Sequence, residues 1–85
     1  MNNANPTLEF SNQKVDFSKS ILVKANLMKA RLTMANLSQA DLYQANLTAS
    51  YLYKANLSGA KLGCADLRGA DLSHASCVGA NLDST

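Results

Sequence analysis

The sequence predicts an all-β protein that winds into a stack of short coils. From Val15 to Ser84 the chain repeats the pattern Ala-(Asn/Asp)-Leu-x-x every five residues, fourteen times and without an insertion. An α-helix brings apolar residues to one face about every 3.6 residues and a flat strand every two, so a strict period of five fits neither. The alternation of three and four residues that a coiled coil requires is also missing. A chain that turns a corner every five residues, and pairs each coil with the next, satisfies this period.

The five positions of the repeat, called columns one to five, differ in how much variation they accept. Column one is Ala in eleven of fourteen repeats, with Val15, Ser20 and Ser50 as exceptions, and column three is Leu in twelve, with Phe17 and Cys77 as exceptions. Column two is Asn or Asp in nine repeats, whereas columns four and five hold nearly any residue. We therefore expect packing to constrain columns one and three, and columns four and five to be free.

These fourteen copies of A(D/N)LXX resemble the repeats of the pentapeptide-repeat family. The resemblance covers residues 15–84 and implies a right-handed quadrilateral parallel β-helix, in which four repeats make one coil and columns one and three point inward. Fourteen repeats then give about three and a half coils. The expected organisation is an N-terminal segment, residues 1–14, followed by the β-helix, residues 15–84.

The composition of the inward columns agrees with this architecture. Only a residue as small as Ala or Ser fits an inner corner beside a stacked Leu, and each buried Leu contributes about 1.5–3 kcal/mol. The predicted core is column three: Phe17, Leu22, Leu27, Leu32, Leu37, Leu42, Leu47, Leu52, Leu57, Leu62, Leu67, Leu72 and Cys77.

Column two has the chemistry of a turn. Asn and Asp side chains are short enough to hydrogen-bond nearby backbone groups, which stabilises a corner. Five repeats depart from Asn or Asp, and their corners are expected to be held less tightly: Ile21, Arg31, Tyr51, Lys61 and Ser76.

The two ends of the stack are expected to differ. Leu8 and Phe10 are out of register with Phe17, so residues 7–14 are predicted to cap the first coil. At the other end, the edge from Ala70 to Leu82 is predicted to expose unpaired backbone groups and Leu side chains. Either this edge meets a partner, which could be a second copy in a homodimer through the uncapped C-terminal coil, or it is frayed; we favour self-association.

The outer surface carries three tyrosines. With twenty residues to a coil, Tyr51 and Tyr53 share one side and Tyr43 lies on the opposite side. Exposed aromatic side chains favour protein contacts. The alternative is that they stabilise the wall as stacked ladders, and the sequence leaves both interpretations open.

The clearest charge pattern is a ring of lysines. Lys19, Lys24 and Lys29 place one positive charge on each of three successive corners of the first coil. Such a ring could bind phosphate or an acidic partner surface. The alternative, which we favour, is that the lysines discourage aggregation at a sheet edge. Asp41 and Lys61 fall in one row and could form an ion pair of little net energy.

The chain offers little for catalysis. His74, the single histidine, is predicted to lie on the opposite side from Cys64, so neither a Cys-His nucleophile nor a metal site is expected. No Gly-rich phosphate loop is present, because the four glycines are scattered through the repeats. The sequence therefore predicts a protein that is not an enzyme and binds no cofactor.

The predicted function is a non-enzymatic protein-interaction or scaffold module whose partner the sequence does not identify. The possible interaction surface comprises Tyr43, Tyr51, Tyr53, Lys19, Lys24, Lys29 and Leu82. The first fourteen residues do not resemble a signal peptide and no apolar run reaches transmembrane length, so we expect a cytoplasmic protein without a membrane contact.

Two alternatives involve nucleic acid or its mimicry. Some proteins of the family resemble a DNA duplex and bind type II topoisomerases, but a net charge of +2 and a short rod disfavour that role here. Direct binding of nucleic acid is not expected either, because eight basic residues against six acidic ones are spread around the rod.

Overall fold

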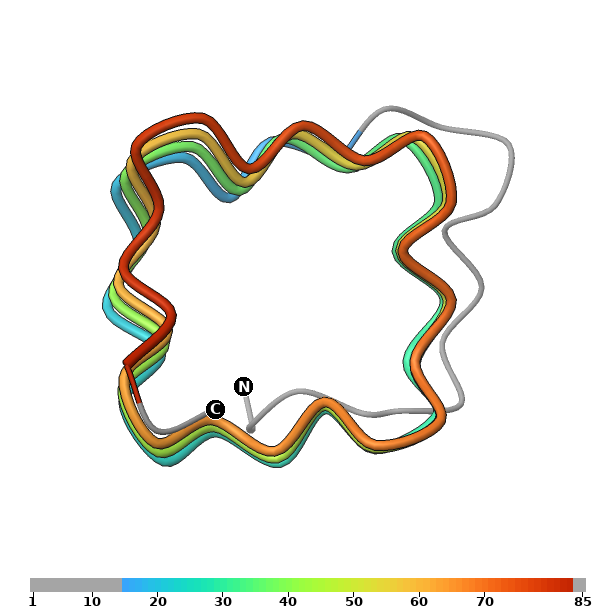
Figure 1. The fold of residues 1–85 in the computed structure, drawn as a ribbon, viewed down its shortest axis with the longest axis horizontal. Coiled ribbons are helices and arrows are strands. Elements are labelled where there is room, and N and C mark those ends of the chain that lie inside the picture. The colour runs from blue at the N-terminus through green and yellow to red at the C-terminus, as the bar shows by residue number, and fades with distance from the viewer. Residues whose placement is uncertain (1–14, 84–85) are drawn as a thin grey trace.

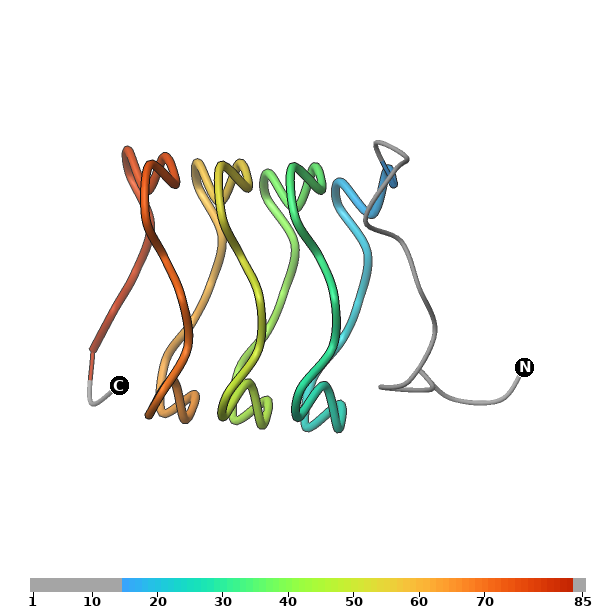
Figure 2. The same cartoon turned by 90° about the vertical axis from the view of Figure 1, so that its right-hand side faces the viewer.

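The computed structural model describes residues 15–83, which form a four-sided coil with one repeat on each side (Figure 1). Viewed with the last coil nearest, the chain runs counter-clockwise as it approaches the viewer, so the helix is right-handed (Figure 1). Figure 2 shows the coils stacked side by side along the axis. The predicted cap, with Leu8 and Phe10, and the end of the last repeat at Ser84 lie outside the described residues.

Successive coils pair in parallel, and the register is twenty residues. Each column-two residue pairs with the column-two residue of the next coil, from Asp16 with Asn36 to Lys61 with Asn81. Between these bridges, the Phe17 N–H donates to the Asn36 carbonyl at 2.8 Å, and the Asn36 N–H donates back to the Val15 carbonyl at 2.8 Å. The parallel four-sided β-helix predicted from the repeat is therefore confirmed. In the described part of the chain each paired segment is a single residue long, with a turn on either side of it.

The corners impose a backbone conformation that the sequence analysis did not anticipate. At each corner the first residue of a repeat donates its N–H to the column-three carbonyl before it, as Ser20 does to Phe17 at 3.1 Å. Column five has a positive φ throughout, 57° to 64° in ten non-glycine residues and 70° to 74° in Gly59, Gly69 and Gly79. A left-handed conformation costs an L-residue roughly 1–2 kcal/mol. The expectation that column five is free is therefore wrong.

A signal for this constraint was present in the sequence. In columns four and five, every β-branched residue occupies column four and none occupies column five. These residues are Val23, Thr33, Thr48 and Val78. A branched Cβ tolerates a positive φ least, so column five excludes these side chains.

Column two closes the corners through its side chains. In all nine repeats with Asn or Asp, the side-chain Oδ1 accepts the N–H of the residue two positions on, at 2.9 to 3.3 Å. The predicted turn chemistry is thus confirmed. The acceptors are Asp16, Asn26, Asn36, Asp41, Asn46, Asn56, Asp66, Asp71 and Asn81.

Columns one and three fill the interior. From Leu32 to Leu62 the column-three side chains are at most 1% exposed, and they alternate with buried small residues of column one. Phe17, Leu22, Leu67, Leu72 and Cys77 are partly buried and pack against this core from its two ends.

Each side of the coil is a face built from every fourth repeat. The serine face comprises residues 15–19, 35–39, 55–59 and 75–79, and its column four is Ser18, Ser38, Ser58 and Val78. The tyrosine face comprises residues 30–34, 50–54 and 70–74, and it is next to the serine face because residues 35–39 directly follow residues 30–34.

The two other faces complete the coil, one opposite the tyrosine face and one opposite the serine face, respectively. The Tyr43 face comprises residues 20–24, 40–44, 60–64 and 80–83, and the asparagine face comprises residues 25–29, 45–49 and 65–69. All four faces share the same interior, so they differ in what columns two, four and five present.

Candidate interaction surface

The tyrosine face carries two exposed aromatic side chains with cationic neighbours. Tyr51 is 48% exposed and Tyr53 is 37% exposed. The Arg31 guanidinium lies 5.7 Å from the centre of the Tyr51 ring, and the Lys54 ammonium lies 5.5 Å from the centre of the Tyr53 ring. The His74 ring meets Tyr53 edge to face, with 5.6 Å between ring centres. Two rings and their cations therefore form one outward patch.

The five-residue repeat brings these side chains together. Tyr51 in column two and Tyr53 in column four flank the inward-pointing Leu52, which is fully buried. The bridges from Arg31 to Tyr51 and from Tyr51 to Asp71 stack the neighbouring coils in register. Burial of Leu52 thus fixes the backbone from which both rings project.

The electrostatics of the patch are dominated by its cations. Arg31 and Lys54 are positive, whereas Asp71 is the acidic residue of this face. The pKa of Asp71 is lowered chiefly by hydrogen bonds from Ser73, with a smaller contribution from nearby His74. Asp71 is therefore an anion whose oxygen is already engaged by the Ser73 N–H at 3.0 Å. The patch as a whole suits an acidic or aromatic partner surface.

The contacts differ from a simple aromatic ladder. One coil away from Tyr51 lie Arg31 on one side and Asp71 on the other, and the ring that Tyr53 meets is His74. The tyrosines therefore contact cations and an imidazole. Both rings keep an exposed part that a partner could cover.

Lys54 and His74 were missed as members of this patch. They belong to column five, where Met34, Lys54 and His74 form a row with a spacing of twenty residues. Reading that row beside the column-four row that contains Tyr53 would have placed both side chains next to the tyrosine.

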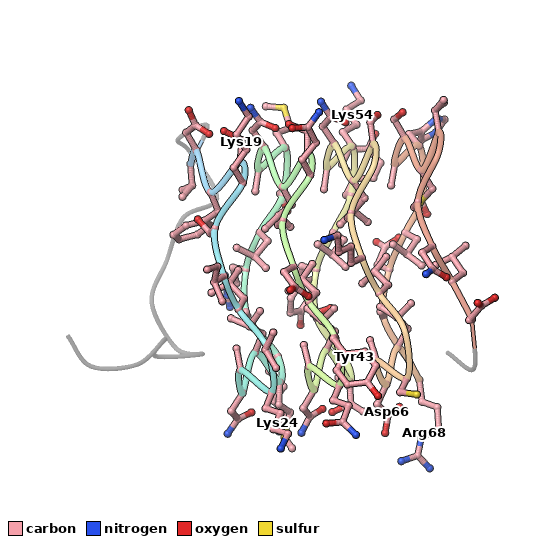
Figure 3. The ribbon with its side chains drawn as sticks, turned by 90° about the vertical axis from the view of Figure 1, so that its left-hand side faces the viewer. Lys19, Lys24, Tyr43, Lys54, Asp66 and Arg68 are labelled. Atoms are coloured by element: carbon pink, nitrogen blue, oxygen red, sulfur yellow. The ribbon has the colours of Figure 1, made fainter. Side chains whose placement is uncertain are left out.

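Tyr43 lies on its own face, across the coil from Tyr51 and Tyr53, as the spacing predicts. It is 45% exposed and rests against Gly63 of the next coil. Figure 3 shows Tyr43 along one edge of this face.

The lysine ring does not converge on one site. Lys19, Lys24 and Lys29 are all exposed and all have the left-handed conformation of column five. Figure 3 shows Lys19 and Lys24 at opposite edges of the Tyr43 face. This spacing does not form a pocket around a phosphate, and it is compatible with protection of the edge.

Leu82, the remaining predicted contact residue, is 45% exposed on the last described coil. Val78 on the same coil is 76% exposed. In the same row, Leu42 and Leu62 are fully buried. Exposure at Leu82 therefore reflects its place in the stack and not a change in the repeat.

The asparagine face carries an ion pair. Arg68 donates to Asp66 from Nε at 2.9 Å and from Nη2 at 2.6 Å. These hydrogen bonds lower the pKa of Asp66 and raise the pKa of Arg68. Because the Arg68 side chain is largely exposed, the pair adds little to stability.

The groups considered for catalysis lie apart. Cys64 belongs to the Tyr43 face and His74 to the tyrosine face, and both cysteines are free thiols. Among residues 15–83, no three His, Cys, Asp or Glu side chains gather as metal ligands. The same part of the chain contains no helix long and apolar enough to cross a membrane.

Comparison with known proteins gives one family. The family model described as "Pentapeptide repeats" matches residues 13–48 and 50–85 with 8 copies. No curated protein is significantly similar in sequence to this chain.

Solved structures include similar folds. Rfr23, a pentapeptide repeat protein from the cyanobacterium Cyanothece 51142, is 37% identical over 78% of this chain, with a TM-score of 0.62. AT2G44920, a pentapeptide repeat protein from the Arabidopsis thaliana thylakoid lumen, is 26% identical over 80% of this chain, with a TM-score of 0.52. The chain covers 48% of the first protein and 58% of the second, so it spans about half the length of the structures it matches.

Proposed function

The chain belongs to the pentapeptide-repeat family, and we propose that it is a non-enzymatic interaction module whose tyrosine face docks onto a partner protein. The observation that carries the proposal is the pair Tyr51 and Tyr53, which stays exposed on a rigid wall beside Arg31 and Lys54. Tyr and Arg are enriched among the residues that dominate binding energy at protein interfaces.

Rigidity of the wall supports this function. Leu52 and Ala55 are fully buried, and the Leu52 N–H donates to the Asp71 carbonyl at 2.8 Å. A side chain held on such a backbone loses less conformational entropy on binding than one on a mobile loop. The tyrosine face therefore presents anchors that are largely in place before a partner arrives.

The loss of turn chemistry also supports this function. Arg31 and Tyr51 occupy column two, where nine of the fourteen repeats use Asn or Asp to close the corner. On the asparagine face, Asn26, Asn46 and Asp66 all make that hydrogen bond. Departures from a locally favourable residue are expected at functional sites.

The test compares capture of proteins by variants of the immobilised chain. The test variant combines Tyr51→Ser with Tyr53→Ser, and the matched control is Met28→Ser, which removes a side chain of similar exposure from the asparagine face. Thermal melting first establishes that both variants are folded.

We expect the wild-type chain and the Met28→Ser control to retain the same protein after a high-salt wash, and the double variant to lose it. Equal retention by all three chains would contradict docking through the tyrosine face. Recovery of nucleic acid alone, and only at low salt, would instead favour the lysine ring.

Self-association through the last coil is a separate proposal. Exposure of Leu82 and Val78 supports it, because apolar side chains at the end of a stack can pack against the same end of a second copy. Leu82→Lys should then convert a dimer to a monomer in light scattering. An unchanged mass in solution for wild type and variant would contradict it.

A further inference from the structure

A second candidate site lies on the Tyr43 face. A depression of about 380 Å³ is bordered there by Asp41, Tyr43, Lys61, Gly63, Cys64 and Asp83. It is separate from the tyrosine face, so the following inference does not depend on the proposed docking of Tyr51 and Tyr53.

Gly63 allows the Tyr43 ring to pack closely beside the depression. It is the glycine of column four, and it lies one coil beyond Tyr43, where the Gln44 N–H donates to its carbonyl at 2.8 Å. A Cβ at Gly63 would stand 3.2 Å from Cδ1 and 3.4 Å from Cε1 of Tyr43. Because φ is not positive at this glycine, close approach of the ring and not backbone conformation accounts for it. The missing side chain lets the ring lie along the wall.

The charged groups around this space are not paired with one another. Asp41 and Lys61 pair through their backbones, but no ion pair joins their side chains, so the predicted salt bridge does not form. The Asp41 carboxylate accepts the Tyr43 N–H at 3.3 Å, a long hydrogen bond. Asp66, in contrast, has both carboxylate oxygens bound by Arg68. Asp41 therefore retains acceptor capacity toward a ligand.

The net charge of the depression favours a cation. Asp41 and Asp83 contribute two negative charges and Lys61 one positive charge, which leaves a net charge of −1. The exposed Tyr43 ring adds an electron-rich aromatic surface to the same space. A guanidinium group satisfies both features, because it stacks on an aromatic ring and donates to carboxylates with a planar fork.

We infer that the depression around Tyr43 and Gly63 receives an arginine side chain of a partner protein. The guanidinium stacks against the Tyr43 ring and donates to Asp41, while Asp83, two coils further along, adds to the negative potential of the depression. Lys61 lies in one row between Asp41 and Asn81 and reduces the affinity by repulsion. It therefore favours partners that supply one cation over partners with a dense basic cluster.

The probe is a capped Gly-Arg-Gly peptide, observed by amide chemical shifts of the full chain during titration. We expect it to shift signals of Asp41, Tyr43, Gly63 and Asp83, with a dissociation constant of about 1 mM, as suits a single side chain. The isosteric peptide with citrulline, which lacks the positive charge, should bind at least about fivefold more weakly. Equal binding of the two peptides, shifts confined to another face, or no shifts would overturn the inference.

Asp41→Asn is the decisive variant because Asn keeps the hydrogen bond that closes the corner, as Asn26 and Asn46 show. It should weaken binding of the arginine peptide about fivefold. Asp71→Asn makes the same change on the tyrosine face and should leave that affinity unchanged. Equal weakening by both variants would indicate a general charge effect and overturn the inference.

The Lys61→Asn variant tests whether the depression binds cations or anions. Loss of the repelling ammonium should strengthen binding of the arginine peptide about twofold to fivefold. If this variant abolishes binding, or if a capped Gly-Glu-Gly peptide binds more tightly than Gly-Arg-Gly, the depression selects anions and the inference is wrong.

Discussion

The tyrosine face and the serine face share one interior and differ in how they use column two. On the serine face, Asp16, Asn36 and Asn56 each accept a backbone N–H across the corner. On the tyrosine face, Asp71 is the residue that does so, because Arg31 and Tyr51 occupy the other two positions.

This difference separates what folds the chain from what the chain presents. The serine face has the side chains that stabilise the corners, whereas the tyrosine face replaces two of them with large exposed groups. A protein selected for stability alone would keep Asn or Asp at these positions. The tyrosine face therefore has the composition expected of a binding surface.

The largest effect should come from the interior that both faces share. Leu52→Ala removes a fully buried side chain and should lower the free energy of unfolding by about 3 kcal/mol. Leu82→Ala is the control, because this side chain is 45% exposed and should cost less than about 1 kcal/mol. Urea denaturation measures both; similar costs would contradict the placement of the core in the middle coils.

A second change concerns a buried residue that differs between the two faces. Ser50, behind the tyrosine face, is 1% exposed, and its hydroxyl has no hydrogen-bond partner. Burying a hydroxyl without a hydrogen-bond partner costs free energy because the group loses its contacts with water. Ser50→Ala removes this cost and should raise the free energy of unfolding by about 1.5 kcal/mol. The reverse change behind the serine face, Ala55→Ser, should destabilise. Calorimetry would show this as melting temperatures shifted in opposite directions, and a fall with Ser50→Ala would refute the explanation.

The next change tests the corners on a face without a proposed site. Gln39 has a φ of 60°, so Gln39→Gly should relieve the cost of the left-handed conformation. Because glycine also gives the unfolded chain more freedom, the free energy of unfolding should rise by only about 0.7 kcal/mol. Ser38→Gly in column four is the control and should destabilise. Denaturant midpoints that move in the same direction for both variants would show that column five carries no special constraint.

The smallest expected change in stability tests the difference between the tyrosine face and the serine face most directly. Tyr51→Asn gives the tyrosine face the corner chemistry of the serine face and should stabilise by about 0.5 kcal/mol through one added hydrogen bond. The same variant should lose partner binding. Thermal melting combined with the capture assay tests both effects. A variant with a lower melting temperature and unchanged partner binding would contradict the idea that Tyr51 favours binding at the expense of stability.

The interior and the turn chemistry were predictable because they repeat. Leu in column three and Asn or Asp in column two occur often enough to reveal their roles, and the column pattern then places Tyr51 and Tyr53 on the same face, on either side of Leu52. The left-handed conformation of column five was missed, because Lys, Gln and Met conceal it better than an unbroken row of Gly would. Contacts such as Tyr53 with His74 and Tyr43 with Gly63 depend on the direction in which a ring lies, which the repeat does not encode.

Photo-crosslinking tests the central claim most directly, because it reports which face touches a partner in the intact chain. Benzoylphenylalanine is placed at Ser73 on the tyrosine face or at Ser58 on the serine face, two column-four positions with the same native residue. Docking through the tyrosine face predicts a discrete cross-linked protein from position 73 and none from position 58. Equal cross-linking from both positions, or from position 58 alone, would contradict it.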